Sequence, residues 1–295
     1  MNFFDFPAFL RLDTAAIDGA VRGFAVRAAG PLSAIKAFLA GLVRLTGLLL
    51  DFIPWPVLLL LAGALGWRSR RSWKRGALYA ALLGLIGALG LWELMKVTLA
   101  VVLASVLIAL VLGIPIGVLI SGSERANRII RPLLDTMQTM PVFVYLIPAL
   151  LLFGTGSASG VIATVIYAVV PVIRLTSLGI RQVDREVVEA ARAFGSTRWQ
   201  TLRKVQIPQA MPTIMTGVNQ TLMMAMAMVV TTSMIGVRGL GMEVLNAVNR
   251  IEIGRGLVAG GCVVILAIVL DRLTQSIPGG KKGRGNGGDS NGAER

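Results

Sequence analysis

Long apolar runs separated by short polar segments make up most of this chain. The clearest run is VTLAVVLASVLIALVLGIPIGVLI at 97–120, which contains no charged residue. A helix of about 20 apolar residues crosses the hydrocarbon core of a bilayer, and lipid offers no partner to an open backbone hydrogen bond, so such runs predict membrane-spanning helices. We predict seven spans, of which the first two are short: 53–67, 76–92, 97–120, 137–153, 160–178, 213–235 and 256–275.

Residues 33–52 allow two interpretations. Their apolar side chains fall on one helical face, whereas Lys36 and Arg44 lie away from it, which is typical of a helix in the membrane plane. The alternative is an ordinary span with an irregular start. The turn IPWP at 53–56 then leads into the first predicted span. The apolar face consists of Ile35, Phe38, Leu42, Leu45, Leu49 and Phe52.

The composition supports an all-α integral membrane protein. The chain of 295 residues is 55% hydrophobic and 15% charged, with a mean hydropathy of +0.75, whereas soluble domains carry about 25% charged residues. The start lacks a basic segment before a continuous apolar core, so we expect no cleavable signal peptide. The sequence has no histidine and one cysteine, Cys262, which excludes a disulfide within the chain and a histidine-based metal or acid–base site.

The net charge of +14 is distributed unevenly over the connections between spans. Connections rich in Lys and Arg collect in the cytoplasm, so this bias predicts a cytoplasmic C-terminus and, with an odd number of spans, a periplasmic N-terminus. The five basic residues within 1–50 argue weakly against export of that segment. We expect no nucleic-acid partner. The basic residues number five in 68–75, three in 121–136, seven in 174–206 and five from Asp271 onward, against one near Lys96, none in GTGSASG and three in 237–255.

These patterns divide the chain into four parts. An N-terminal segment with the amphipathic helix covers 1–52, and peripheral transmembrane helices cover 53–95. The core transmembrane domain covers 96–277. The remaining residues, 278–295, form a glycine-rich basic tail that we expect to be disordered and cytoplasmic.

The segment VVEAARAFGSTRWQTLRKVQIPQAMP, from Val187 to Pro212, is the longest polar stretch inside this apolar chain. Asp184 is a plausible N-cap for a first short helix, and Gly195 stands where a helix C-terminus favours glycine. Ser196 can cap a second helix that runs to about Val205, and Pro208 is expected to prevent its continuation. The sequence therefore predicts two short helices joined at a glycine corner on the cytoplasmic side.

The surface of the first short helix suits contact with another protein. The small side chains of Ala190 and Ala191 permit close approach of a second surface. Glu189 lies between Arg185 and Arg192 and can form ion pairs along the helix or with a partner. The pattern fits an amphipathic helix resting on lipid headgroups equally well.

The sequence EAARAFG followed by VQIP resembles the EAA loop of ABC-importer permeases, in spacing as well as residue type. The resemblance implies a type I ABC importer transmembrane fold, in which this loop is the coupling helix that seats in a separate ATPase subunit. The chain contains no G-x-x-x-x-G-K-[ST] phosphate loop, so we expect no enzyme activity and no cofactor bound by this chain, with ATP and Mg on the partner. The motif positions are Glu189, Ala190, Ala191, Gly195, Val205, Ile207 and Pro208.

Most of 95–277 resembles the permease subunit of glycine betaine/proline importers, whereas the first 90 residues match far less well. The matching segments include LLDTMQTMPVFVYLIPALLLFG, PTIMTGVNQTLM and VILAIVLDRLTQ. The resemblance implies uptake of glycine betaine, proline betaine, choline or carnitine across the inner membrane, and a relative imports trimethylamine N-oxide. It also implies a permease homodimer and a separate substrate-binding protein. The alternatives are an ABC permease for another small solute, such as an amino acid or sulfonate, and a channel or scaffold without an ATPase.

A quaternary ammonium is normally captured by a cage of aromatic rings, and the mid-span aromatics here are sparse: Phe143, Tyr145 and Tyr167. Capture is therefore expected mainly in the external binding protein. The lone carboxylates in or beside spans have no evident catalytic or metal-binding partner. Polar side chains inside apolar runs are costly and often functional, although hydrogen bonds between helices also explain them. The candidates for the translocation pathway are Gln138, Thr139, Tyr145, Asn219, Gln220 and Thr221.

Overall fold

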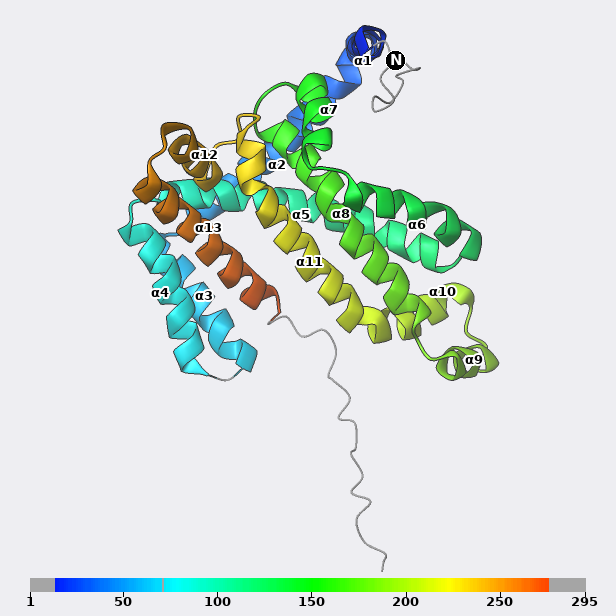
Figure 1. The fold of residues 1–295 in the computed structure, drawn as a ribbon. Coiled ribbons are helices and arrows are strands. Elements are labelled where there is room, and N and C mark those ends of the chain that lie inside the picture. The colour runs from blue at the N-terminus through cyan, green and yellow to red at the C-terminus, as the bar shows by residue number, and fades with distance from the viewer. Residues whose placement is uncertain (1–13, 71, 276–295) are drawn as a thin grey trace, which may run out of the picture.

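The computed structural model describes residues 14–70 and 72–275. This part of the chain folds into thirteen α-helices and one π-helical segment, η1, without any strand (Figure 1). The predicted all-α fold is confirmed. The elements are α1 (Thr14–Arg27), α2 (Ala29–Phe52), α3 (Trp55–Arg70), α4 (Trp73–Ala88), α5 (Trp92–Ser121), α6 (Glu124–Thr139), α7 (Phe143–Phe153), α8 (Ser157–Arg181), α9 (Arg185–Ala193), α10 (Arg198–Thr201), η1 (Leu202–Gln206), α11 (Ile207–Ser233), α12 (Leu240–Arg250) and α13 (Ile253–Thr274).

The core of the bundle is formed by α5, α8 and α11, which pack closely because glycines stand at their crossings. A Cβ atom placed on Gly117 of α5 would lie 2.7 Å from the Cβ of Thr176 in α8. A Cβ atom on Gly217 of α11 would lie 3.0 Å from the Cβ of Leu175. Small residues allow helix backbones to approach each other where lipid provides no hydrophobic drive between helices. The three helices therefore form one tightly packed unit.

The two ends of the bundle differ in charge. We call the end that holds the C-terminus of α8, together with α9 and α10, the coupling end. The basic α3–α4 connection and the last turn of α13 lie toward the same side (Figure 1). The glycine-rich α7–α8 connection and the turn before α12 lie at the opposite end, where Gly156 N–H donates to the Ile235 carbonyl over 3.0 Å. Connections rich in Lys and Arg thus share one side of the bundle, as the charge bias predicts.

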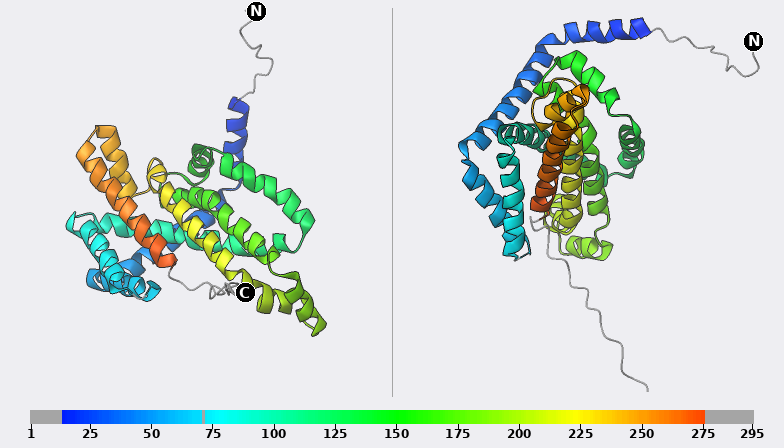
Figure 2. Two further views of the ribbon diagram at one scale, coloured as in Figure 1. Left: turned by 60° about the horizontal axis from the view of Figure 1, so that its bottom comes forward. Right: turned by 60° about the vertical axis from the view of Figure 1, so that its left-hand side comes forward.

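Helix α2 crosses the opposite end of the bundle. Near its start, Lys36 lies close to the α7–α8 connection, because its Nζ atom would be 3.4 Å from a Cβ atom placed on Gly154. Near its end, Asp51 forms a 2.7 Å ion pair with Lys96 in the first turns of α5. With 24 residues the helix is long and apolar enough to cross a membrane. Both halves thus contact the same end of the bundle, and the in-plane and spanning interpretations of this segment both stay predictions. In the right-hand view of Figure 2, α1 lies at the side remote from the last turn of α13.

The number of spans is roughly consistent with the seven that the sequence predicts. In the described part, five helices are long and apolar enough to cross a membrane, or six if one bent pair counts as a span. The segment 55–68 is only a shorter apolar helix, and α4 has 16 residues.

The predicted continuous span at 137–153 is wrong. It breaks between α6 and α7, whose axes differ by 94°. Pro141 explains the break, because a residue before proline avoids the helical region, and Met140 is extended, with ψ at 133°. Helices α6 and α12 arise in segments that the sequence analysis treats as connections. The predicted tail at 278–295 lies outside the described residues, and the predicted boundary at 95 falls inside the first turn of α5.

Candidate functional site

Helix α9 begins and ends as its sequence predicts. The Asp184 side chain accepts a hydrogen bond from the Glu186 amide over 3.0 Å, so Asp184 is the N-cap. At the other end Gly195 adopts a positive φ of 82°. Its amide donates to the Arg192 carbonyl over 2.9 Å, and the Ser196 amide donates to the Ala191 carbonyl over 3.1 Å. This pair of bonds is a Schellman motif, which favours glycine at this position.

The second short helix is capped by Thr197, one residue later than predicted. The Thr197 hydroxyl accepts from the Gln200 amide, and the Gln200 side chain accepts from the Thr197 amide over 2.9 Å. This reciprocal pair is a capping box. Ser196 instead belongs to the preceding Schellman motif, in which its amide donates to the Ala191 carbonyl. The prediction that Ser196 caps this helix is therefore wrong by one residue.

The predicted break at Pro208 is also wrong. Helix α10 passes through η1 into α11 without a loop. Pro208 stands in the first turn of α11. Proline has no amide hydrogen, and after the wider π-helical turn of η1 this position needs no intrahelical hydrogen bond. The helical backbone is thus continuous from Arg198 to Ser233.

The outer surface of α9 and α10 is free of contacts with the bundle. Helix α9 has no buried residue, and Glu189 and Ala190 are exposed. Two aromatic side chains extend from this surface, because Phe194 is 92% exposed and Trp199 is 65% exposed. Among the ion pairs of the described residues, none joins Glu189 to a neighbouring arginine. The projection therefore carries an unpaired carboxylate beside uncovered apolar side chains.

The remaining motif residues secure the projection to the bundle. Val205 lies in η1 and is half-buried, and Ile207 packs against a cluster formed by Ile180, Ala210 and Ile214. Gly179 of α8 permits this contact, because a Cβ atom there would lie 2.9 Å from the Cβ of Thr213 in α11. The motif thus divides into an outward half on α9 and an inward half at the start of α11.

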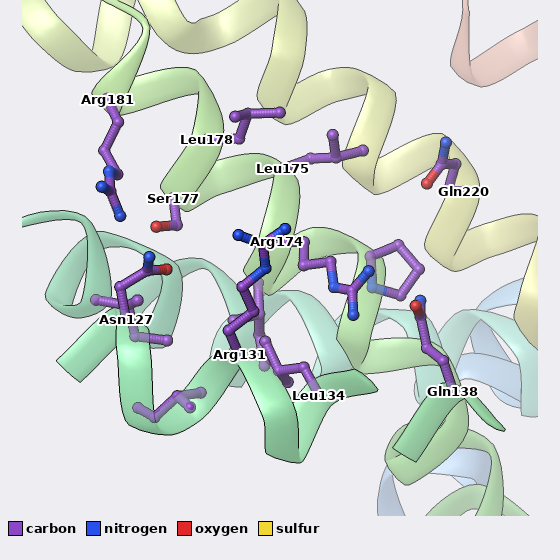
Figure 3. A pocket seen from close by; sticks show the side chains of 14 residues that line it. Asn127, Arg131, Leu134, Gln138, Arg174, Leu175, Ser177, Leu178, Arg181 and Gln220 are labelled. Carbon is purple, nitrogen blue, oxygen red and sulfur yellow. The ribbon is translucent and has the colours of Figure 1, made fainter. Parts of the chain in front are cut away.

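A cavity of about 530 Å³ lies between α6, α8 and α11 (Figure 3). It brings together two of the six candidate pathway residues, Gln138 and Gln220, although they are 82 positions apart in the sequence. Its volume lies in the range of small-molecule sites, about 300–1,000 Å³. Three arginines and a serine that the sequence analysis did not select also line it: Arg131, Arg174, Arg181 and Ser177.

The other candidate pathway residues lie elsewhere. The Tyr145 hydroxyl donates to the Met137 carbonyl. The ring centroids of Tyr145 and Tyr167 are 6.4 Å apart, so these two aromatic side chains pair with each other. Thr139 is exposed and its hydroxyl donates to the Thr136 carbonyl over 3.0 Å. Thr221 is buried, and its hydroxyl has no hydrogen-bond partner in the described structure.

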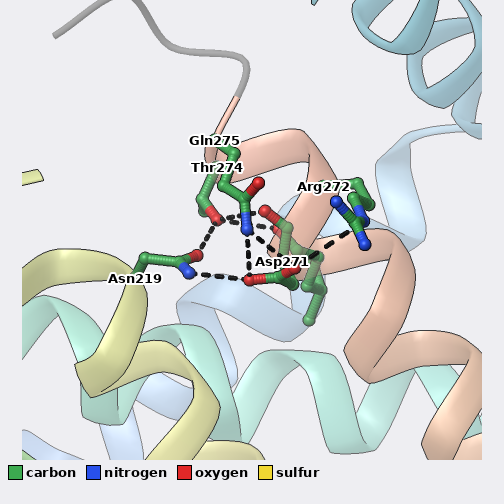
Figure 4. Close-up of polar contacts among 6 residues, drawn as sticks. Asn219, Asp271, Arg272, Thr274 and Gln275 are labelled. Atoms are coloured by element: carbon green, nitrogen blue, oxygen red, sulfur yellow. Dashed lines mark hydrogen bonds and ion pairs between the residues drawn. The ribbon is translucent and has the colours of Figure 1, made fainter. Parts of the chain in front are cut away.

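Asn219 joins α11 to α13 and does not line the cavity described above (Figure 4). Its amide nitrogen donates to the Asp271 carboxylate over 2.7 Å, and its carbonyl oxygen accepts from the Thr274 hydroxyl over 2.6 Å. Gln275 also donates to Asp271. These contacts give Asn219 a structural partner, which is the alternative that the sequence analysis left open for polar residues in spans.

The described residues contain no group of three His, Cys, Asp or Glu side chains that could hold a metal ion. Cys262 is buried in α13. The notable features of the molecule are therefore a projecting helix pair and a basic cavity.

Residues 109–278 match the family model described as "Binding-protein-dependent transport system inner membrane component". The chain is 48% identical over 234 residues to the glycine betaine/proline betaine transport system permease protein ProW of Escherichia coli, covering 79% of this chain and 66% of that protein. It is 48% identical over 259 residues to the glycine betaine transport system permease protein OpuAB of Bacillus subtilis, covering 87% of this chain and 89% of that protein. The chain thus spans slightly less than two thirds of the first of these relatives.

The fold resembles a chain in inward-facing structures of the MetNI methionine ABC transporter. The TM-score is 0.52 at 22% identity, over 60% of this chain and 88% of that chain. At this identity the likeness concerns the fold alone, and it agrees with the predicted type I importer architecture.

Proposed function

This chain belongs to the family of binding-protein-dependent transport system inner membrane components, and from that premise we propose that it forms the membrane pathway of an ATP-driven importer for a quaternary-amine compatible solute. Glycine betaine and proline betaine are the solutes named for its relatives. Trimethylamine N-oxide, choline and carnitine share the methylated ammonium group and belong to the same proposal.

The observation that carries the proposal is the construction of the α9–α10 projection. The projection is capped at both ends of α9, uncovered on its outer surface, and continuous with a helix of the core. A helix that only closes the bundle would bury its apolar side chains against it. Phe194 instead stays 92% exposed at the coupling end. This arrangement suits a helix that seats in a groove of a second protein.

In the proposed mechanism, a separate ATPase subunit binds the projection and hydrolyses ATP with its Mg ion. Nucleotide binding moves the projection, and the continuous backbone of α10, η1 and α11 transmits the movement into the core. A nucleotide shifts the balance between inward-facing and outward-facing states only through contacts that differ between them. The exposed face of α9 supplies such contacts on this chain.

Two copies of the chain pair around the pathway in this proposal, and a binding protein delivers the solute from outside. The coupling end faces the cytoplasm, which agrees with the basic connections found there. The C-terminus is then cytoplasmic, and the end crossed by α2 is periplasmic. Selective capture by the binding protein is part of the same proposal, because mid-span aromatic residues are sparse in the sequence.

The test is a charge reversal on the projection, Glu189→Lys. We expect this variant to insert normally, because Glu189 is exposed and contributes to no packing, but to lose ATP-driven uptake and retain little ATPase on purification. Asp18→Lys is the matched control, because it makes the same charge change at an exposed position of α1, outside the projection, and should leave uptake intact. Normal uptake by Glu189→Lys would refute the coupling role. A thermal-shift screen of the cognate binding protein against the candidate solutes tests the substrate class separately.

A further inference from the structure

The cavity between α6, α8 and α11 carries a net positive charge. Arg131 of α6 and two arginines of α8, Arg174 and Arg181, line it, and no carboxylate is among its lining side chains in the described structure. Figure 3 shows the guanidinium groups of Arg131 and Arg174 extending into the same space. Like charges brought close together repel each other. Such a lining favours a ligand that brings a negative charge.

Only one of these arginines has a partner that neutralises it. Arg174 contacts the carboxylate of Asp135. Arg131 and Arg181 take part in no ion pair within the described part of the chain. Arg174 also keeps its buried Nε atom without a hydrogen-bond partner there. Two carboxylates, Glu124 and Asp135, line a neighbouring hollow with Arg131 and Arg181, so the protein balances the charge of the cavity only in part.

A buried hydroxyl in the cavity lining points to a ligand independently of the charge. The Ser177 side chain lines the cavity, the residue is 5% exposed, and its Oγ has no hydrogen-bond partner in the described structure. Most buried polar atoms in proteins are hydrogen-bonded, so an unpartnered one beside a cavity requires an explanation. A ligand oxygen placed between Ser177 and the arginines would satisfy both groups.

The rest of the lining suits the other half of a zwitterion. Apolar side chains such as Pro171 and Leu178 form much of the wall. The amides of Gln138 and Gln220 lie on the side away from Ser177 and Arg181 (Figure 3). Amide oxygens and apolar surface accommodate a methylated ammonium group without an opposing positive charge. The cavity thus has a basic side and a neutral side.

We infer that this cavity holds a zwitterionic solute during transport, with its carboxylate toward Arg131, Arg174 and Ser177 and its methylated ammonium toward the glutamines. The inference rests on the proposed function and deepens it. It narrows the solutes of the proposed function, because the permease itself then discriminates against an organic cation that lacks a carboxylate, such as choline. Selection then occurs twice, first in the binding protein and again in the membrane.

The test is ligand-observed NMR by saturation transfer on the purified permease–ATPase complex without binding protein. We expect transfer to the methyl signal of glycine betaine and none to that of choline. In Arg131→Gln the affinity for betaine should fall about tenfold, because a charge-assisted hydrogen bond is lost. Ser177→Ala should also weaken binding, and it is expected to fold because it removes only an unpartnered hydroxyl. Arg125→Gln is the control, since it removes one charge from the exposed side of α6 and Arg125 does not line the cavity.

Equal transfer to betaine and choline would overturn the inference, as would unchanged betaine binding in Arg131→Gln. Loss of the betaine signal in nanodiscs that contain phosphatidylglycerol, but not in a detergent without phosphate groups, would also overturn it, because the cavity would then hold a lipid headgroup. Displacement by inorganic phosphate alone would mark a general anion site and refute it. ATP-driven uptake of betaine is measured in parallel on the complete complex. Uptake without cavity binding rejects this inference alone, whereas no uptake rejects the proposed function.

Discussion

Substitutions at Gly195 test the corner of the coupling projection with little effect on the rest of the fold. The residue holds φ at 82°, and a Cβ atom placed on it meets nothing within 4 Å. The cost of a side chain here is therefore purely conformational. For an alanine in the left-handed region that cost is about 1–2 kcal/mol, which corresponds to a loss of roughly 5–30-fold in the population of the native corner.

Three substitutions give a graded series. Asparagine tolerates the left-handed region, so Gly195→Asn should keep most of the uptake. Gly195→Ala should lose part of the uptake, because the left-handed conformation costs an alanine about 1–2 kcal/mol. Proline cannot reach φ of 82° because its ring holds φ near −65°, and it also removes the amide that donates to the Arg192 carbonyl over 2.9 Å. Gly195→Pro should therefore abolish uptake.

The assay is ATP-driven uptake into proteoliposomes that contain the complete complex, with membrane insertion measured on the same preparations. Insertion should stay normal throughout the series, because α9 has no buried residue. ATPase association should fall in the same order as uptake. Normal uptake by the proline variant, or an equal loss in the asparagine and proline variants, would refute the proposed geometry of the corner.

Two further substitutions test the packing of the bundle. Asn219→Leu removes the 2.7 Å hydrogen bond to Asp271, and we expect a stability loss of about 1 kcal/mol, measured as a lower melting temperature in detergent; an unchanged melting temperature would show that the contact contributes nothing. Gly241→Ala places a Cβ atom 2.3 Å from the Val229 carbonyl oxygen, so α12 and α11 must separate at a cost of about 1–3 kcal/mol. Gly261→Ala meets nothing within 4 Å and should keep the wild-type melting temperature, and equal effects of the two alanines would contradict the packing.

Hydrophobic periodicity predicts the long core helices well, because their apolar runs have few competing signals. The spans at 97–120, 160–178, 213–235 and 256–275 all lie within or largely within observed helices. The pattern fails at 137–153, where apolar residues continue across Pro141 although the backbone turns by 94°. A hydropathy pattern does not show where the chain changes direction. The restriction that proline imposes on Met140 is the local signal that indicates the turn.

The helix caps of the coupling projection are predictable because they depend on a few neighbouring residues. Asp184 and Gly195 have the expected roles, and the error at Ser196 is a shift of one residue, because Gln200 forms the capping box with Thr197. The continuity through Pro208 was not predictable from proline statistics alone, since it depends on a π-helical turn that the packing of Ile207 supports.

The basic cavity could not be predicted from single segments. Its lining comes from α6, α8 and α11, and the sequence analysis assigned Arg131 and Arg174 to cytoplasmic connections by their charge alone. The missed signal is the helical spacing of Arg131, Leu134 and Gln138 on one face of α6. The identification of Gln138 and Gln220 as polar residues in apolar runs selected two lining positions, while the same rule also selected Asn219, which binds Asp271 instead.

Site-specific crosslinking of the α9 surface tests the central claim most directly. Cys262 is buried and is replaced by alanine, so that a single cysteine at Ala190, which is exposed, carries the crosslinker in the assembled complex. The account predicts a crosslink to the ATP-hydrolysing subunit whose yield changes between nucleotide-free and ATP-bound complexes. Crosslinks confined to the permease's own helices, with no ATPase adduct in either state, would contradict it.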